Sequence, residues 1–219
     1  MQKGKELRIA ALSFLAASAC AASGQFVYEY SGPPVPIPDV GSIEVSLPVL
    51  DSYPMAELNV GIILPHTWQG DLRLTIVGPW GGGLMLFDRP GHPQQPFGFS
   101  ADDYGNLAQL GYFELADAGA SVYDVPFVAQ PGIARVTGQW DAEGGSLNSY
   151  AAGRDVQGTW RLRIEDFASG DIGRLERFRL TVTPVPEPSM GIGFAIACAF
   201  AACRRQRRQR TTPSLSRSR

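Results

Sequence analysis

Cysteine is scarce in this sequence of 219 residues, and its central part has none. Cys20, Cys198 and Cys203 all lie in apolar stretches near the two ends. A disulfide framework in the central part is therefore excluded, and a domain there must be stabilised by packing or by a bound metal. A domain of about 150 residues can bury roughly 70% of the surface of its unfolded chain, so a sizeable core is available.

Lysine is also missing from residues 25–183, where nineteen acidic and nine basic residues give a net charge of −10. The other ten basic residues lie at the ends, three of them before Ile9 and seven from Arg204 onward. The overall net charge of −2 therefore conceals an acidic body between basic ends. Such a body argues against nucleic-acid partners, because phosphate backbones are bound by basic surfaces.

Histidine occurs only twice, as His66 and His92. Nucleophilic catalysis needs a base beside an activated serine or cysteine, and the sequence has no G-x-S-x-G turn. We expect His66 to be structural, with its imidazole bonded to backbone groups of a turn, and His92 to be exposed in a proline-rich loop. Paired carboxylates of the glycosidase kind are an alternative, but surface carboxylates of an acidic domain are usually solvated. We therefore predict no catalytic residues.

Sustained helical periodicity is absent from residues 25–183. Short runs in which apolar and polar residues alternate occupy 43–47, 58–64, 72–76 and 84–87, and further runs follow near 111–115 and 121–129. Gly- and Pro-containing turns separate them, and residues 88–111 and 141–156 are long polar loops. The pattern predicts an all-β, jelly-roll-like antiparallel β-sandwich of seven or eight strands.

The stretch from Gly158 to Val182 has the clearest alternation, in two runs on either side of a polar turn. We predict that the two runs pair as a closed hairpin. Trp160 is the predicted structural anchor of the core, together with His66 at the end of an earlier strand.

Residues 1–24 combine a basic start, an apolar stretch and small residues near Ala21, which is typical of a secretory signal peptide. An uncleaved anchor and a lipoprotein acylated on Cys20 are the alternatives. Residues 25–36 are expected to be a proline-rich lead-in to a domain over 37–183.

Several motifs occur in the order of one known family. They are GTWRLRIED and GDIGRLERFRL near the end of the domain, preceded by IPD at 37–39, LNV at 58–60, HTWQGDL at 66–72, Gly78-Pro79 and Arg89. This set resembles the P domain, also called Homo B. That family is a β-sandwich appended to subtilisin-like proprotein convertases and found in many bacterial secreted proteins. The resemblance implies a non-catalytic module that stabilises a protease partner, and the catalytic domain of such proteases is missing from this sequence.

Residues 184–210 resemble a PEP-CTERM sorting signal, which an exosortase-type enzyme recognises. The motif residues are Pro186, Glu187 and Pro188, and an arginine cluster begins at Arg204 and Arg205. The apolar run 190–203 between them would span only about 21 Å as a helix, against a hydrocarbon core of roughly 30 Å. We therefore expect transient inner-membrane anchoring, and the basic tail 211–219 has no explanation.

Calcium is the expected cofactor, if the domain has one, because it prefers loop carboxylates and carbonyls. The candidate ligands are Asp39, Asp71, Asp102, Asp103, Asp166 and Asp171. Trp68, Trp80, Trp140 and Tyr104 are candidates for a sugar-binding surface, although such aromatic residues more often belong to a core.

Together these features predict an exported, non-catalytic module at the cell surface or in the extracellular matrix. Its expected roles are adhesion, envelope or matrix assembly, or stabilisation of a partner. An accessory part of a subtilisin-like serine protease system and a carbohydrate-binding module are the alternatives. The expected partners are the sorting enzyme and either a cell-surface polysaccharide, a separate protease or an envelope protein.

Overall fold

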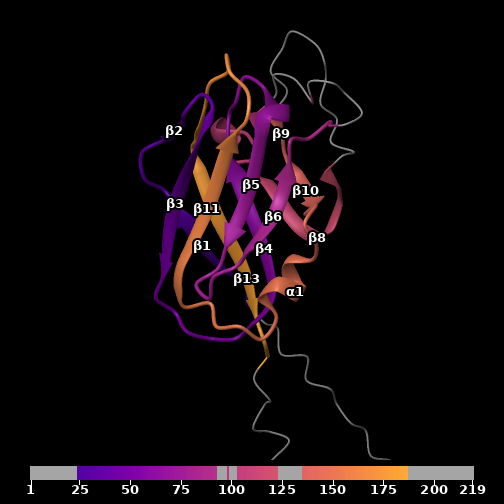
Figure 1. Ribbon diagram of the computed structural model, residues 1–219. Coiled ribbons are helices and arrows are strands. Elements are labelled where there is room, and N and C mark those ends of the chain that lie inside the picture. Colours follow the sequence, from indigo (N-terminus) through magenta and orange to yellow (C-terminus); the bar gives the residue numbers. More distant parts are fainter. Residues whose placement is uncertain (1–23, 93–97, 99–102, 123–134, 187–219) are drawn as a thin grey trace, which may run out of the picture. The chain divides into compact units, whose positions relative to one another are not determined.

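The computed structural model describes residues 24–92, 98, 103–122 and 135–186, and most of its regular structure is β-strand (Figure 1). The strands are β1 (Phe26–Tyr30), β2 (Val35–Ile37), β3 (Gly41–Val49), β4 (Met55–Ile63), β5 (Leu72–Val77), β6 (Gly83–Asp88), β7 (Asp103–Tyr104), β8 (Phe113–Ser121), β9 (Arg135–Val136), β10 (Gly138–Asp141), β11 (Gly158–Asp166), β12 (Gly173–Leu175) and β13 (Arg177–Pro184). Helical structure in these residues comprises α1 (Leu147–Ala151), the 3-10 turns η1 (Gln69–Asp71) and η2 (Leu107–Gln109), and a 3-10 position at Val122. The all-β class predicted from the sequence is therefore observed.

Two main sheets contain most of the strands. The five-stranded sheet has the order β1-β13-β4-β8-β10, and the four-stranded sheet has the order β3-β11-β5-β6. Neighbours in both sheets are antiparallel except β8 and β10, which are parallel. In the described residues the main sheets thus hold nine strands instead of the predicted seven or eight. Two further sheets are the short pairs β2–β12 and β7–β9.

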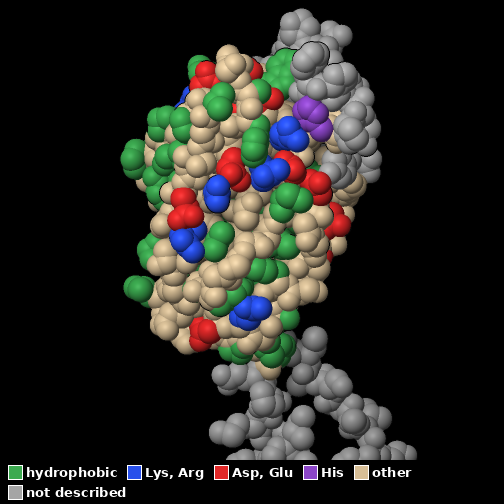
Figure 2. All heavy atoms as spheres, viewed as in Figure 1, with side chains coloured by type: hydrophobic (Ala, Val, Ile, Leu, Met, Phe, Trp, Pro, Cys, Tyr) green, Lys and Arg blue, Asp and Glu red, His purple; other side chains and the backbone are tan. Residues whose placement is uncertain are grey.

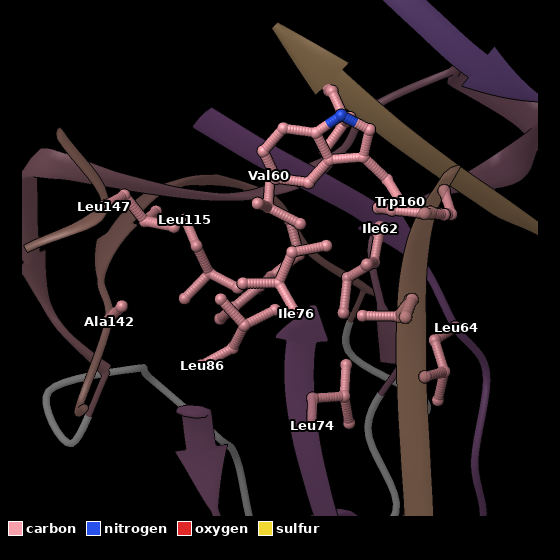
Figure 3. Packing of buried hydrophobic residues seen from close by; sticks show 14 of the residues in the cluster. Val60, Ile62, Leu64, Leu74, Ile76, Leu86, Leu115, Ala142, Leu147 and Trp160 are labelled. Atoms are coloured by element: carbon pink, nitrogen blue, oxygen red, sulfur yellow. The ribbon is translucent and has the colours of Figure 1, made fainter. Parts of the chain in front are cut away.

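A single hydrophobic cluster takes side chains from both main sheets. Val60 and Ile62 of β4 come from the five-stranded sheet, and Ile76 of β5 and Trp160 of β11 come from the four-stranded sheet; all four are fully buried. Figure 3 shows these side chains converging on a common interior. The strict alternation of buried and less buried residues along β5, β11 and β13 follows from this arrangement, because each strand presents one face to the core.

The predicted hairpin over 158–182 is wrong. β11 pairs with β3 and β5, whereas β13 pairs with β1 and β4, so the two strands belong to different sheets. The segment between them is long enough to carry β12, which pairs with β2 as it crosses from one sheet to the other. Alternation fixes which side chains of a strand are buried, but it does not identify the neighbouring strand, because both strands face the same core.

The segment 25–36, predicted to be only a lead-in, lies inside the folded unit. Its residues Phe26–Tyr30 form β1, which pairs along its whole length with β13, from Phe26 opposite Val182 to Tyr30 opposite Phe178. β1 is an edge strand, and its mixed exposure gives only a weak alternating pattern. Backbone pairing therefore places this strand where its side-chain pattern does not predict one.

The loop predicted over 141–156 contains the short helix α1, and Asp117 of β8 stabilises its start. The Asp117 carboxylate accepts hydrogen bonds from the backbone N–H groups of Leu147 (2.7 Å) and Asn148 (3.2 Å), and Ser146 Oγ accepts one from Ser149 N–H. The Asn148 side chain in turn accepts from Leu58 N–H of β4 at 2.9 Å. These contacts satisfy backbone donors that a helix of five residues leaves unpaired.

The outward-facing residues of the four-stranded sheet carry neighbouring opposite charges. Arg161 of β11 lies 3.3 Å from Glu44 of β3, and Arg73 of β5 lies 2.8 Å from Asp88 of β6. Figure 2 shows basic and acidic side chains beside each other across the viewed face. Arginine thus neutralises part of the domain's acidic charge locally, although each exposed pair contributes only about 0 to 1 kcal/mol.

Candidate functional site

Both ends of the described chain leave the five-stranded sheet at one end, which we call the terminal end. β1 starts and β13 finishes there, since Phe26 pairs with Val182. The opposite end, which we call the distal end, carries three connections: 38–40 before β3, 64–71 between β4 and β5, and 167–176 between β11 and β13. Two backbone contacts join the last two connections, from Thr67 N–H to Ile172 O and from Arg174 N–H to Pro65 O.

His66 lies at the centre of the distal end and is closed off from solvent. Its Nδ1 atom lies 2.6 Å from the carbonyl oxygen of Trp68 and 3.0 Å from the Trp68 amide nitrogen. Its Nε2 atom lies 3.4 Å from Oδ2 of Asp166, and both side chains have zero exposure. The imidazole thus joins the turn before β5 to the end of β11, and bulk solvent has no access to this pair.

Asp71 and Asp166, the two buried carboxylates near His66, have raised pKa values. Burial, followed by repulsion from Asp166 and Asp171, raises the pKa of Asp71 to about 6. Burial also raises the pKa of Asp166, against the opposing effects of the Ala168 N–H and of His66. Asp166 therefore disfavours the charged form of Asp71, and Asp39 disfavours that of Asp166.

The structure brings four of the six candidate calcium ligands to the distal end. Each is already held by a protein donor or lies close to another carboxylate: Asp39 accepts from Gly170 N–H (3.0 Å), Asp171 accepts from Thr67 Oγ1 (2.8 Å), Asp166 contacts His66, and Asp71 lies near Asp166 and Asp171. In the described residues no group of three or more Asp, Glu, His or Cys side chains has the spacing of a metal site. These four carboxylates therefore contact loop residues of the protein itself. Calcium binding stays a prediction.

The two other candidate ligands lie elsewhere. Asp103 belongs to β7 and lies 3.7 Å from Arg135 of β9, and Asp102 falls outside the described residues. Of the sorting residues, Pro186 follows β13, whereas Glu187, Pro188, Arg204 and Arg205 fall outside the described residues, as does almost all of the predicted signal peptide. No helix in the described part of the chain is long and apolar enough to span a membrane.

Of the four aromatic residues considered for a sugar-binding surface, Trp68 is half-buried in the turn before β5 and the other three pack into the core or its rim. Tyr104 is fully buried and stacks on Phe87. Trp80 packs edge-to-face on Trp160, with ring centroids 5.1 Å apart, and Trp140 stacks on Phe113 at 5.7 Å. These side chains belong to the core and its rim, at separate positions.

A distal feature that the sequence analysis missed is a cation–aromatic cluster on Phe167. The ring lies between two guanidinium groups, 4.7 Å from that of Arg73 and 5.5 Å from that of Arg89. The hydrogen bond from Arg73 also lowers the pKa of Asp88. Residues from β5, from the segment after β6 and from the segment after β11 meet here, so sequence spacing alone gives no sign of the cluster.

A second missed feature is a groove at the distal end, made of two adjoining hollows of about 310 and 370 Å³. The hollows share Pro65, Asp103, Arg135 and Arg174, and we call them together the arginine groove. The first hollow is further lined by Ile63, Gly105, Leu107, Ala108 and Glu176, and the second by His66, Thr67, Ile172 and Gly173. Arg135 and Arg174 come from strands of two and three residues, too short for a recognisable pattern.

The sequence matches no protein-family model and no curated protein. Among solved structures, it is similar to the serine protease of Aeromonas sobria, with 17% sequence identity over 74% of this chain and a TM-score of 0.45. It is similar also to the complex of that protease with a chaperone, with 18% identity over 75% of this chain and a TM-score of 0.46. In both cases the chain spans 27% of the length of the solved protein.

Proposed function

We propose that the chain is an exported β-sandwich module of the P-domain type, displayed at the cell surface, that binds a partner and catalyses no reaction. The motifs in family order and the two terminal stretches that resemble export and sorting signals support the proposal. The family assignment, the jelly-roll-like topology and the location at the cell surface all belong to this proposal.

The observation that carries the non-catalytic part is the closure of His66. A general base must reach the proton that it abstracts, within hydrogen-bond distance or through one water. His66 and Asp166 instead have unexposed side chains that contact each other, and Nδ1 of His66 contacts the Trp68 backbone. The neighbouring hydroxyl of Thr67 donates to Asp171 and to Ile172 O. This arrangement supports a structural role for His66.

The positions of the chain ends fit display at a surface. Because β1 begins opposite the end of β13, segments on both sides of the domain attach at its terminal end. A C-terminal anchor after residue 186 would hold the domain by this end and leave the distal loops available to partners. The distal end carries the arginine groove and exposed apolar side chains such as Ile172 (72% exposed).

An accessory role for a separate serine protease is the second candidate, and it would use the same distal surface. In this accessory role, unlike in the surface-binding role, the activity or stability of the protease would depend on this chain. A carbohydrate-binding role has less support, because three of the four candidate aromatic residues pack into the core or its rim.

Processing in a host with an exosortase-type enzyme tests the sorting part of the proposal. The full chain and the variant Glu187→Ala are followed by immunoblot and by mass spectrometry of the C-terminus, with Glu44→Ala as a control for loss of an acidic side chain at an exposed ion pair of β3. We expect the wild type and Glu44→Ala to lose their C-terminal segment and Glu187→Ala to retain it. Identical processing of all three chains would contradict the proposal.

An activity assay tests the non-catalytic part. The purified full chain is incubated with a labelled protein substrate and with a serine-reactive fluorophosphonate probe. We expect no cleavage and no labelling above those of a heat-denatured sample. Hydrolysis that disappears in a His66→Gln variant with retained fold would refute it.

A further inference from the structure

We propose that the arginine groove binds an acidic, extended peptide segment of a partner protein. The inference deepens the proposed function, on which it rests, by naming the chemistry of the partner. The observations behind it are the shape of the groove, the free edges of two guanidinium groups and an aliphatic wall beside them.

The groove is large enough for side chains of a peptide. Its two hollows have volumes of about 310 and 370 Å³, within the range of ligand pockets, and they adjoin through four shared residues. The wall from Pro65 to Thr67 and the facing backbone of Gly173 and Arg174 are linked through Arg174 N–H and Pro65 O. A continuous trough along these residues suits an extended chain.

Arg135 and Arg174 each lie beside one mostly buried carboxylate, and Arg174 also donates a hydrogen bond to its partner. The closest approach of each guanidinium group to its carboxylate is through Nε, to Asp103 for Arg135 and to Glu176 for Arg174. The carboxylates are mostly buried, with 15% and 7% side-chain exposure, while the two arginine side chains are 52% and 55% exposed. Each carboxylate is thus more buried than its arginine, although both also line the groove.

The outer edges of both guanidinium groups are left for a ligand. Among the described residues, neither arginine donates a hydrogen bond from Nη1 or Nη2. The paired Nη atoms of a guanidinium match the two oxygens of a carboxylate, and Arg174, already held through Nε, loses less conformational freedom on binding. Two such edges in one groove therefore favour a ligand with two carboxylates.

The wall beside the arginines indicates a peptide rather than an acidic sugar chain. Ile63, Pro65, Leu107 and Ala108 are aliphatic, and none of the described residues that line the two hollows is Phe, Tyr or Trp. Leu107 is 42% exposed and would be covered by an apolar side chain between two acidic ones. A segment of the form acidic–apolar–acidic fits this arrangement.

The acidic character of the whole domain does not prevent such binding. At physiological ionic strength the Debye length is about 8 Å, so exposed charges farther away are largely screened. Asp103 and Glu176 offset much of the charge of Arg135 and Arg174, so a ligand would be attracted by hydrogen bonds to the exposed guanidinium edges rather than by a net positive field. Because such bonds are charge-assisted, affinity should still fall as salt rises.

Fluorescence polarisation with the full chain tests the proposal. The probe is a fluorescein-labelled peptide, Gly-Ser-Asp-Leu-Asp-Ser-Gly with an amidated C-terminus, and the reference probe has Asn in place of both Asp. We expect the acidic probe to bind and the Asn probe to bind at least about tenfold more weakly, because the charge-assisted hydrogen bonds are lost. Raising NaCl from 50 to 200 mM should also weaken binding.

Variants then localise the site. Arg135→Gln and Arg174→Gln should each weaken binding of the acidic probe about tenfold, and Arg174→Lys should weaken it while it preserves the positive charge beside Glu176. Arg161→Gln, which removes an equal charge from an ion pair outside the groove, should change the affinity less than twofold. Circular dichroism and melting of each variant show whether the fold is retained.

Three outcomes would overturn the proposal. They are equal affinity for the Asp and Asn probes, equal losses from the groove variants and Arg161→Gln, or binding of a uronic-acid oligosaccharide with no binding of the peptide. Sorting of the chain does not depend on the groove, so normal processing with failed peptide binding would refute this inference and leave the proposed function standing.

Discussion

Asp71 is expected to destabilise the folded domain at neutral pH, so replacing it with Asn should stabilise the protein. Its pKa rises from 3.8 to about 6 on folding, mainly through burial and through the nearby Asp166. A raised pKa means that the folded state prefers the protonated form. The resulting cost is absent below about pH 4, grows between about pH 4 and 6, and is complete above about pH 6.

The size of this cost follows from the two pKa values. Their difference corresponds to about 3 kcal/mol at 1.36 kcal/mol per pKa unit. Since the Asp71 carboxylate keeps some contact with water, screening reduces our estimate to about 1 to 2 kcal/mol. Asp71→Asn should therefore raise the free energy of unfolding by this amount at pH 8 and by almost nothing at pH 4.

Urea denaturation followed by far-UV circular dichroism at pH 4, 6 and 8 measures the effect. Asp141→Asn, at an exposed position of β10, is the matched control for loss of one carboxylate and should change stability by less than about 0.5 kcal/mol at each pH. A loss of stability in Asp71→Asn at pH 8, or an equal effect at all three pH values, would contradict this explanation.

Further predictions concern the core, the helix and calcium. Trp160→Ala should lower the free energy of unfolding by about 3 to 5 kcal/mol, because it empties a fully buried position and leaves Val156 O without its 2.9 Å hydrogen bond. Urea unfolding measures this loss, and the control Thr159→Ala should change stability by less than about 0.5 kcal/mol. Asp117→Ala should lower the free energy of unfolding by about 1 kcal/mol or more, because two backbone N–H groups of α1 lose their acceptor. If the same assay shows no loss, Asp117 does not stabilise the start of α1. Millimolar calcium should raise the melting temperature and chelator should lower it, and an unchanged melting temperature would end the calcium hypothesis.

The sequence was sufficient to predict the class of fold and the buried faces of its main strands. Trp160, Leu162 and Ile164 alternate with charged residues, and all three are fully buried, because one side of a strand that faces a core must be apolar. Pairing was not predictable in the same way. β11 and β13 are consecutive long strands with a polar turn between them, yet they lie in different sheets.

The candidate site was predicted only in part. His66 belongs to a recognisable motif, and its contact with the Trp68 backbone is local in sequence. Its partner Asp166 lies a hundred residues away, and Arg135 and Arg174 meet at the groove only because their short strands pair with distant segments. Contacts of this kind depend on the order of strands in space, which alternation of side chains does not specify.

The most direct test of display at the cell surface is labelling of intact cells through a cysteine at the distal end. Ile172→Cys places a thiol at a position that is 72% exposed in a domain without native cysteines, and the wild type measures the background from Cys198 and Cys203. A membrane-impermeant maleimide is added before or after lysis. The account predicts that Ile172→Cys is labelled on intact cells well above the wild type, and labelling that appears only after lysis would contradict it.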